Sequence, residues 1–130
     1  MSYLLSHLPR SAGSASPGAR IDLNRLLNRP GYFGDAHIHA YVEDTSRHKL
    51  RRRGTPPAPH VELEISDCDR AIHLEFVLTS SGHRENALFK VDTLIASLTA
   101  FRAAVAAEAD LYEQRERARK RRRARPLLPI

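Results

Sequence analysis

Histidines and glutamates recur with a period of two residues in segments that resemble β-strands. They are His37, His39, His73, Glu62, Glu64 and Glu75. Because alternate residues of a strand point to the same side, these side chains could collect on one outward face of a sheet. Imidazole and carboxylate groups suit zinc, manganese or iron. His-x-His on a strand also occurs in metal-dependent hydrolases, but those enzymes need a large barrel and many more ligands.

The alternative is a solvated sheet face with Glu–His pairs between strands, and we favour it. An acid/base pair from Glu62 and Glu75 would need a cleft and a nucleophile, and the sequence indicates neither. Glycine-rich phosphate-binding motifs and a nucleophile-elbow pattern are absent from the sequence. We therefore predict no catalytic residues, no metal ligands and no cofactor, and we expect a protein that is not an enzyme.

Positive charge is concentrated in two short runs. Arg47–Arg53 carries +5, and Arg115–Ile130 carries +7. Since the whole chain carries +6, the remaining residues carry −6. The dense run from Arg115 to Arg125 can neutralise several phosphates and release their counterions. It has no interleaved aromatic residues, so it predicts contact with phosphate and not base stacking.

We predict that the cations of both runs bind nucleic acid: Arg115, Arg117, Arg119, Lys120, Arg121, Arg122, Arg123, Arg125, Arg47, Lys49, Arg51, Arg52 and Arg53. Other interpretations stay open. The C-terminal run could contact an acidic protein or a membrane surface, or it could be a solubilising tail. The first run could be a solvated loop.

A long amphipathic helix is predicted from Arg84 to about Glu113. Its apolar residues recur at spacings of three and four and include Leu88, Val91, Ile95, Leu98, Val105 and Tyr112, with Ala109 in phase. One small sheet can cover only about the first four turns of this helix. Val105, Ala109 and Tyr112 are therefore predicted to meet a second copy or another protein, and a homodimer is expected.

The segments before the helix predict a small sheet. Ile21–Asn28 has the spacing of a short helix, and Gly34–Val42 alternates as a strand. Val61–Ser66 and Ala71–Leu78 form the clearest hairpin, with a turn at Asp67–Arg70. This turn pairs Ile65 with Ile72 and Leu63 with Leu74 on the buried face. On the other face it pairs Glu64 with His73 and Glu62 with Glu75.

The fold class predicted is α+β. A short N-terminal helix precedes a three-stranded antiparallel sheet, and the long C-terminal helix packs on one sheet face and ends in a basic tail. The order helix, three strands, helix resembles that of double-stranded RNA-binding domains. Those domains begin the last helix with a lysine cluster, whereas Arg84 and Lys90 are the cations near this one. We expect a flexible arm over 1–20, one domain over 21–113 with a long loop at 44–60, and a tail over 114–130.

These features favour a small non-enzymatic binding or adaptor protein that touches nucleic-acid phosphates, in the manner of phage or mobile-element accessory proteins. The first alternative is a protein-interaction module whose long helix docks a partner. The second is a metal-dependent enzyme on the His/Glu face. A single cysteine, Cys68, and the lack of a long apolar run or secretory signal predict a cytoplasmic protein without a membrane span. No small-molecule substrate is inferred.

Overall fold

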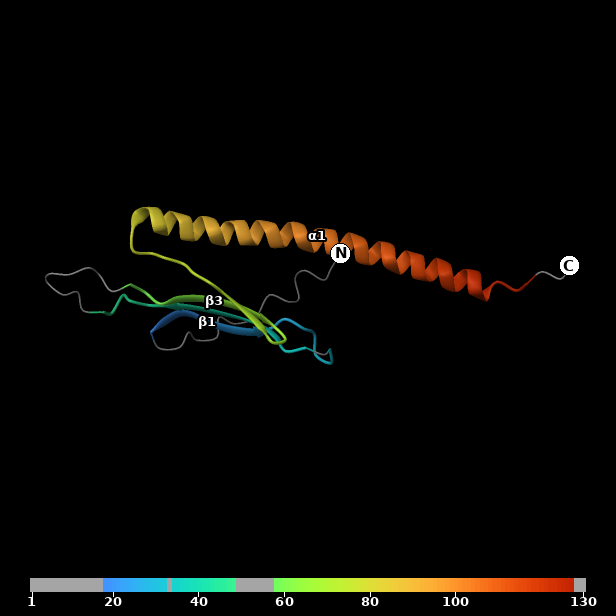
Figure 1. Cartoon of the computed structure of the whole chain (residues 1–130), viewed down its shortest axis with the longest axis horizontal. Coiled ribbons are helices and arrows are strands. Elements are labelled where there is room, and N and C mark those ends of the chain that lie inside the picture. The colour runs from blue at the N-terminus through green and yellow to red at the C-terminus, as the bar shows by residue number, and fades with distance from the viewer. Residues whose placement is uncertain (1–17, 33, 49–57, 128–130) are drawn as a thin grey trace. The chain divides into compact units, whose positions relative to one another are not determined.

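The computed structural model describes residues 18–32, 34–48 and 58–127. The described chain forms, in order, β1 (Ala19–Leu26), β2 (Ala36–Glu43), β3 (Val61–Asp67), β4 (Arg70–Leu74) and α1 (Ser81–Ala124). All three strand pairs are antiparallel, and the sheet order β1-β2-β3-β4 follows the chain (Figure 1). The protein is therefore α+β, as predicted. The flexible arm predicted for 1–20 lies outside the described residues except at 18–20.

The chain divides into two compact units, one ending at Ala87 and the other beginning at Leu88. The sheet belongs to the first unit, and nearly all of α1 belongs to the second. The packing of the helix on the sheet stays a prediction, as does a single domain over 21–113.

The prediction of an N-terminal helix is wrong, because Ile21–Asn28 is largely strand β1. Ile21 and Leu23 share one side of this strand, and Asp22 and Asn24 share the other, so the segment also fits a period of two. Backbone pairing with β2 runs from Ala19 opposite Glu43 to Leu26 opposite His37. The sheet consequently has four strands instead of three, and the similarity to the element order of double-stranded RNA-binding domains does not hold.

The β3–β4 hairpin has the predicted register. Ile65 pairs with Ile72, and Glu64 pairs with His73. Strand β4 ends at Leu74, four residues earlier than predicted. One more pair would place Glu75 opposite Glu62, and like charges directly opposite each other destabilise a sheet.

The hairpin turn places a non-glycine residue in the left-handed region. Cys68 has φ 54°, and Asp67 pairs with Arg70 across the two-residue turn. A positive φ at the first central position is the pattern of a type II′ turn, where glycine is usual. The Cys68 backbone N–H donates to the carbonyl of Asp35 at 3.0 Å, which ties the turn to the start of β2.

Helix α1 is longer than predicted and includes most of the basic run. It begins at Ser81, where the Ser80 hydroxyl accepts a hydrogen bond from the His83 backbone N–H at 3.1 Å. This is an N-cap, which satisfies one of the free N–H groups of the first turn. The helix ends at Ala124, two residues before Pro126, as expected because the residue before a proline avoids helical geometry.

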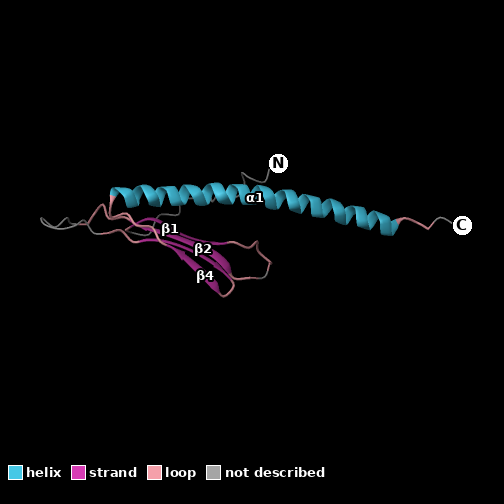
Figure 2. Ribbon diagram, turned by 45° about the horizontal axis from the view of Figure 1, so that its top comes forward, coloured by secondary structure: helices cyan, strands magenta, loops and turns pink. Residues whose placement is uncertain are grey.

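The two faces of the sheet differ in polarity. The strand register places Leu23, Ile38, Leu63, Ile65 and Leu74 on one face, while histidines and carboxylates occupy the other. Figure 2 shows the strands that form the sheet side by side. Among the described residues, the buried apolar side chains are those of Ala19, Ala36 and Ala87. In the described part of the chain, no helix is both long and apolar enough to cross a membrane.

Candidate functional site

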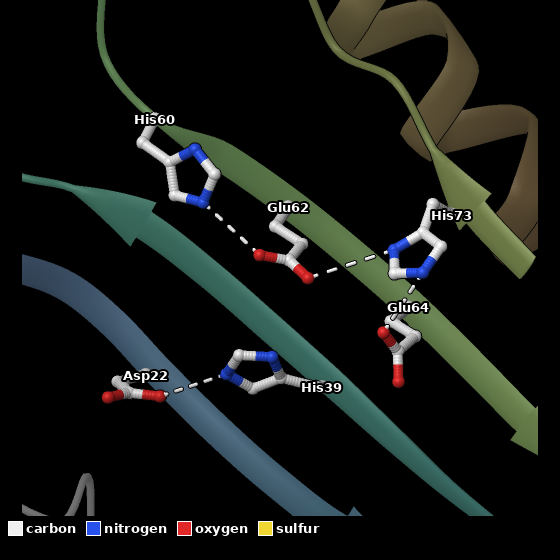
Figure 3. Close-up of polar contacts among 6 residues, drawn as sticks. All are labelled: Asp22, His39, His60, Glu62, Glu64 and His73. Atoms are coloured by element: carbon white, nitrogen blue, oxygen red, sulfur yellow. Dashed lines mark hydrogen bonds and ion pairs between the residues drawn. The ribbon is translucent and has the colours of Figure 1, made fainter. Parts of the chain in front are cut away.

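The polar face of the sheet joins imidazoles to carboxylates from all four strands. The residues concerned, drawn in part in Figure 3, are Asp22, His37, His39, His60, Glu62, Glu64 and His73. Strand alternation puts them on one side, because residues an even number of positions apart in a strand point the same way. His60 lies just before β3 and is two residues from Glu62. We refer to these seven residues as the His/Glu face.

Glu64 lies at the centre of the His/Glu face and bridges two imidazoles. Its Oε1 lies 3.2 Å from Nε2 of His37, and its Oε2 lies 3.2 Å from Nε2 of His73. His73 is directly opposite in β4, whereas His37 is a diagonal neighbour in β2. The Glu64 side chain is 22% exposed, so it has lost much of its water, and the two imidazoles supply hydrogen-bonding partners in its place.

Glu62 repeats this arrangement two residues earlier in the same strand. Its Oε2 lies 3.1 Å from Nε2 of His60, and its Oε1 lies 3.7 Å from Nδ1 of His73. The His60 ring also lies against Tyr41, with 5.4 Å between ring centroids. A continuous chain therefore runs from His60 through Glu62, His73 and Glu64 to His37.

One subset of this chain has the spacing of a metal site. Glu62, Glu64 and His73 each offer a ligand atom, and these atoms all lie within 4.8 Å of one another. Carboxylate oxygen with imidazole nitrogen is a donor set used by divalent transition metals. Among the described residues, Glu62, Glu64 and His73 form the one group of three or more histidine, cysteine, aspartate or glutamate side chains whose ligand atoms lie this close together.

A separate pair lies toward the β1 edge of the same face. Nε2 of His39 is 3.2 Å from Oδ1 of Asp22, and the two side chains are 30% and 35% exposed. Figure 3 shows this pair apart from the contacts that join Glu62, Glu64 and His73. It contains the same chemical groups as the contacts of Glu62, Glu64 and His73, which makes it a natural internal comparison.

Sequence reasoning anticipated most of this face and missed two members. His37, His39, His73, Glu62 and Glu64 share it as predicted, but Glu75 follows the end of β4 and does not pair with Glu62 in the strand register. Asp22 was missed because β1 was predicted to be a helix. His60 was assigned to the loop, although its position two residues before Glu62 is the signal that could have placed it on this face.

The basic end of α1 is a regular helix with exposed cations. Seven of the predicted phosphate-binding residues lie in it, from Arg115 to Arg123, and Arg125 follows directly. Arg115, Arg119 and Arg122 have helical spacings of four and three, so they line one side, and Arg117 and Arg121 line another. Arg117 forms an ion pair with Glu113 one turn earlier. An open groove is lined by Ala118, Arg121, Arg122 and Arg125.

The predicted partner-interface residues also lie together on α1. Val105, Ala109 and Tyr112 line an open, shallow groove with Ala104 and Glu108. Val105 and Tyr112 are 49% and 66% exposed. These three residues therefore lie on one side of a regular helix, as their spacing in the sequence predicted.

The first basic run is described only at its beginning. Arg47 is exposed in a turn after β2, where the His48 backbone N–H donates to the Thr45 carbonyl. Hydrogen bonds from the Ser46 side chain and backbone, with the nearby charge of Arg20, lower the pKa of Asp44. Lys49, Arg51, Arg52 and Arg53 lie outside the described residues, so their predicted contact with nucleic acid stays a prediction.

Comparison with known protein families, curated proteins and solved structures found no match for this chain.

Proposed function

We propose that this chain is a small non-enzymatic binding protein that contacts nucleic-acid phosphates through the basic end of α1. The observation that carries the proposal is the continuation of one helix, Ser81–Ala124, through the Arg-rich segment with its cations exposed. The helix from Arg115 to Arg123 is about 12 Å long. Over that length a DNA duplex carries about seven phosphate charges, so the density of cations approaches that of the polyanion.

The contacts are expected to position the protein on phosphate without reading the base sequence. Cations lie on several sides of the helix, and arginine and lysine contacts to phosphate carry no sequence information. If about five cations contact duplex phosphates, the logarithm of the binding constant falls with the logarithm of salt concentration with a slope near −4.5. A cytoplasmic location and a phage or mobile-element origin stay predictions.

The decisive experiment compares two full-length double variants with equal charge loss. Arg119 and Arg122 are changed to Gln in one variant, and Lys90 and Arg102 are changed to Gln in the other. Binding of duplex DNA and duplex RNA is measured across a salt series. We expect the first variant to lose affinity and about two units of salt slope, while the second stays near wild type. Equal losses in both variants, or no binding at low salt, would overturn the proposal.

Deletion of Arg115–Ile130 provides a second test. Because these residues extend beyond the predicted packed part of the helix, the melting temperature should stay nearly unchanged while most nucleic-acid binding is lost. Retention of full binding would move the contact to another part of the chain.

The second candidate function is a protein-interaction module, favoured by the apolar side chains on α1. Val105 and Tyr112 are 49% and 66% exposed and line a groove with Ala109, beyond the part of the helix that the sheet is predicted to cover. Contiguous apolar surface of this kind marks contact sites for other proteins. The predicted partner is a second copy of the chain.

Sedimentation velocity at tens of micromolar protein tests this candidate. A dimer that is lost in the variant Val105→Glu, but kept in the variant Glu108→Gln, would support self-association through this side of α1. A strict monomer at every concentration would remove the homodimer and leave only a different protein as the partner. A metal-dependent enzyme on the His/Glu face is the remaining alternative.

A further inference from the structure

We propose that the His/Glu face binds one zinc ion, held by Glu62, Glu64 and His73. Nucleic-acid contact by α1 does not involve these residues, so the inference is independent of the proposed function. It goes against the expectation that ordinary Glu–His pairing accounts for this face. The argument rests on the positions of the donor atoms, on what orients them, and on their charge.

The donor atoms need a side-chain adjustment to reach bonding geometry. Zinc binds imidazole nitrogen and carboxylate oxygen at about 2.0–2.2 Å in tetrahedral geometry, so two ligand atoms on one ion lie about 3.4 Å apart. The three atoms here lie within 4.8 Å of one another. The His73 side chain is 60% exposed at the edge strand β4, so rotation of its side chain can bring the donor atoms about 1 Å closer, to the separation that zinc requires.

The two outer histidines orient the carboxylates toward His73. His60 contacts Oε2 of Glu62, and His37 contacts Oε1 of Glu64. The other oxygen of each carboxylate then faces the His73 ring, Oε1 of Glu62 at Nδ1 and Oε2 of Glu64 at Nε2. Rotation of the ring would present one of these nitrogens to an ion held between the two oxygens. Partners of this kind, which hold a ligand without touching the metal, fix ligand orientation in metal sites.

Charge on this face also favours a cation. Glu62 and Glu64 are two residues apart on the same side of β3, and their carboxylates are 30% and 22% exposed. A divalent ion would balance the two carboxylates, and the solvent-facing side of the site leaves a coordination position for water.

The test uses full-length protein that has been stripped with a chelator and then titrated with zinc chloride at pH 7.5. Calorimetry and elemental analysis after dialysis measure affinity and stoichiometry. We expect one zinc per chain, with affinity reduced at least tenfold in Glu64→Gln and in His73→Ala. The matched control is His39→Ala, which removes an imidazole paired with a carboxylate on the same face and should change affinity less than twofold.

Two further measurements keep the proposal falsifiable. Far-UV circular dichroism of each variant shows whether the sheet is retained, and Glu64→Gln preserves the shape of the side chain. X-ray absorption of the zinc-loaded protein should show a first shell of oxygen and nitrogen without sulfur. Equal loss in His39→Ala and His73→Ala would show adventitious binding to exposed histidines and overturn the site. No zinc binding by the wild-type chain, or a sulfur ligand from Cys68, would also overturn it.

Discussion

The imidazole of His73 lies against the carboxylate of Glu64, with Nε2 3.2 Å from Oε2. The two residues are directly opposite in the β3–β4 pair, so the hairpin register creates the contact. Glu64 also holds His37 from the other side. One carboxylate therefore links three neighbouring strands through their side chains, in addition to the backbone ladder.

Replacement of Glu64 by Ala should destabilise the metal-free protein. The change leaves two imidazoles without this acceptor, and partial exposure lets water replace part of the loss, so we expect a decrease of about 0.5–1.5 kcal/mol in the free energy of unfolding. Urea denaturation measures it. Asp22→Ala is the comparison, because it removes a carboxylate that holds the imidazole of His39 at an edge strand. A Glu64→Ala protein as stable as wild type would show that the contacts of Glu64 with His37 and His73 do not stabilise the fold.

The turn between β3 and β4 should be improved by glycine. Cys68 has φ 54°, a conformation that costs an L-residue about 1–2 kcal/mol. Glycine removes this cost but loses about 0.5–1 kcal/mol through its freer unfolded chain. We expect Cys68→Gly to raise the free energy of unfolding by about 0.5–1 kcal/mol, and Cys68→Val to lower it. Thermal denaturation under reducing conditions measures both, and the opposite order would contradict the turn geometry.

The predicted packing of α1 on the sheet can be measured with a double-mutant cycle. If Leu74 and Ile95 pack together, each single change to Ala should cost about 2–5 kcal/mol. Their coupling energy should be about 0.5–3 kcal/mol. Leu74 with Val105 is the control pair, because Val105 lies about 15 Å further along the helix from Ile95. Near-wild-type stability of both single variants would mean that α1 does not pack on this face of the sheet.

Helical structure at the basic end should strengthen nucleic-acid binding beyond the effect of charge. Ala118→Pro removes a helical hydrogen bond within the Arg-rich segment and leaves every charge in place. We expect affinity for duplex DNA to fall several-fold, because the cations must then be ordered on binding. Ala118→Gln keeps both the helix and the charge and serves as the control. Equal affinity of the two variants would mean that charge alone is sufficient.

The sequence by itself determined the elements with a strong and uninterrupted pattern. Alternation in Val61–Ser66 and Ala71–Leu78 set the faces of the hairpin, and its turn set the pairing of Glu64 with His73. Apolar residues at spacings of three and four predicted the long helix, although α1 extends beyond the predicted range of Arg84 to about Glu113. These signals are local, so side-chain periodicity and turn chemistry within a few residues are enough to predict them.

Tertiary structure decided the features that depend on distant residues. The eight residues of β1 fit both helical and strand spacing, and hydrogen bonding to β2 selected the strand. That selection brought Asp22 to His39, and the register of three strands brought His37, His60 and His73 to two glutamates of β3. The sequence of one strand does not determine which residues of the adjacent strands lie opposite it, because the register of a sheet is a property of the paired strands.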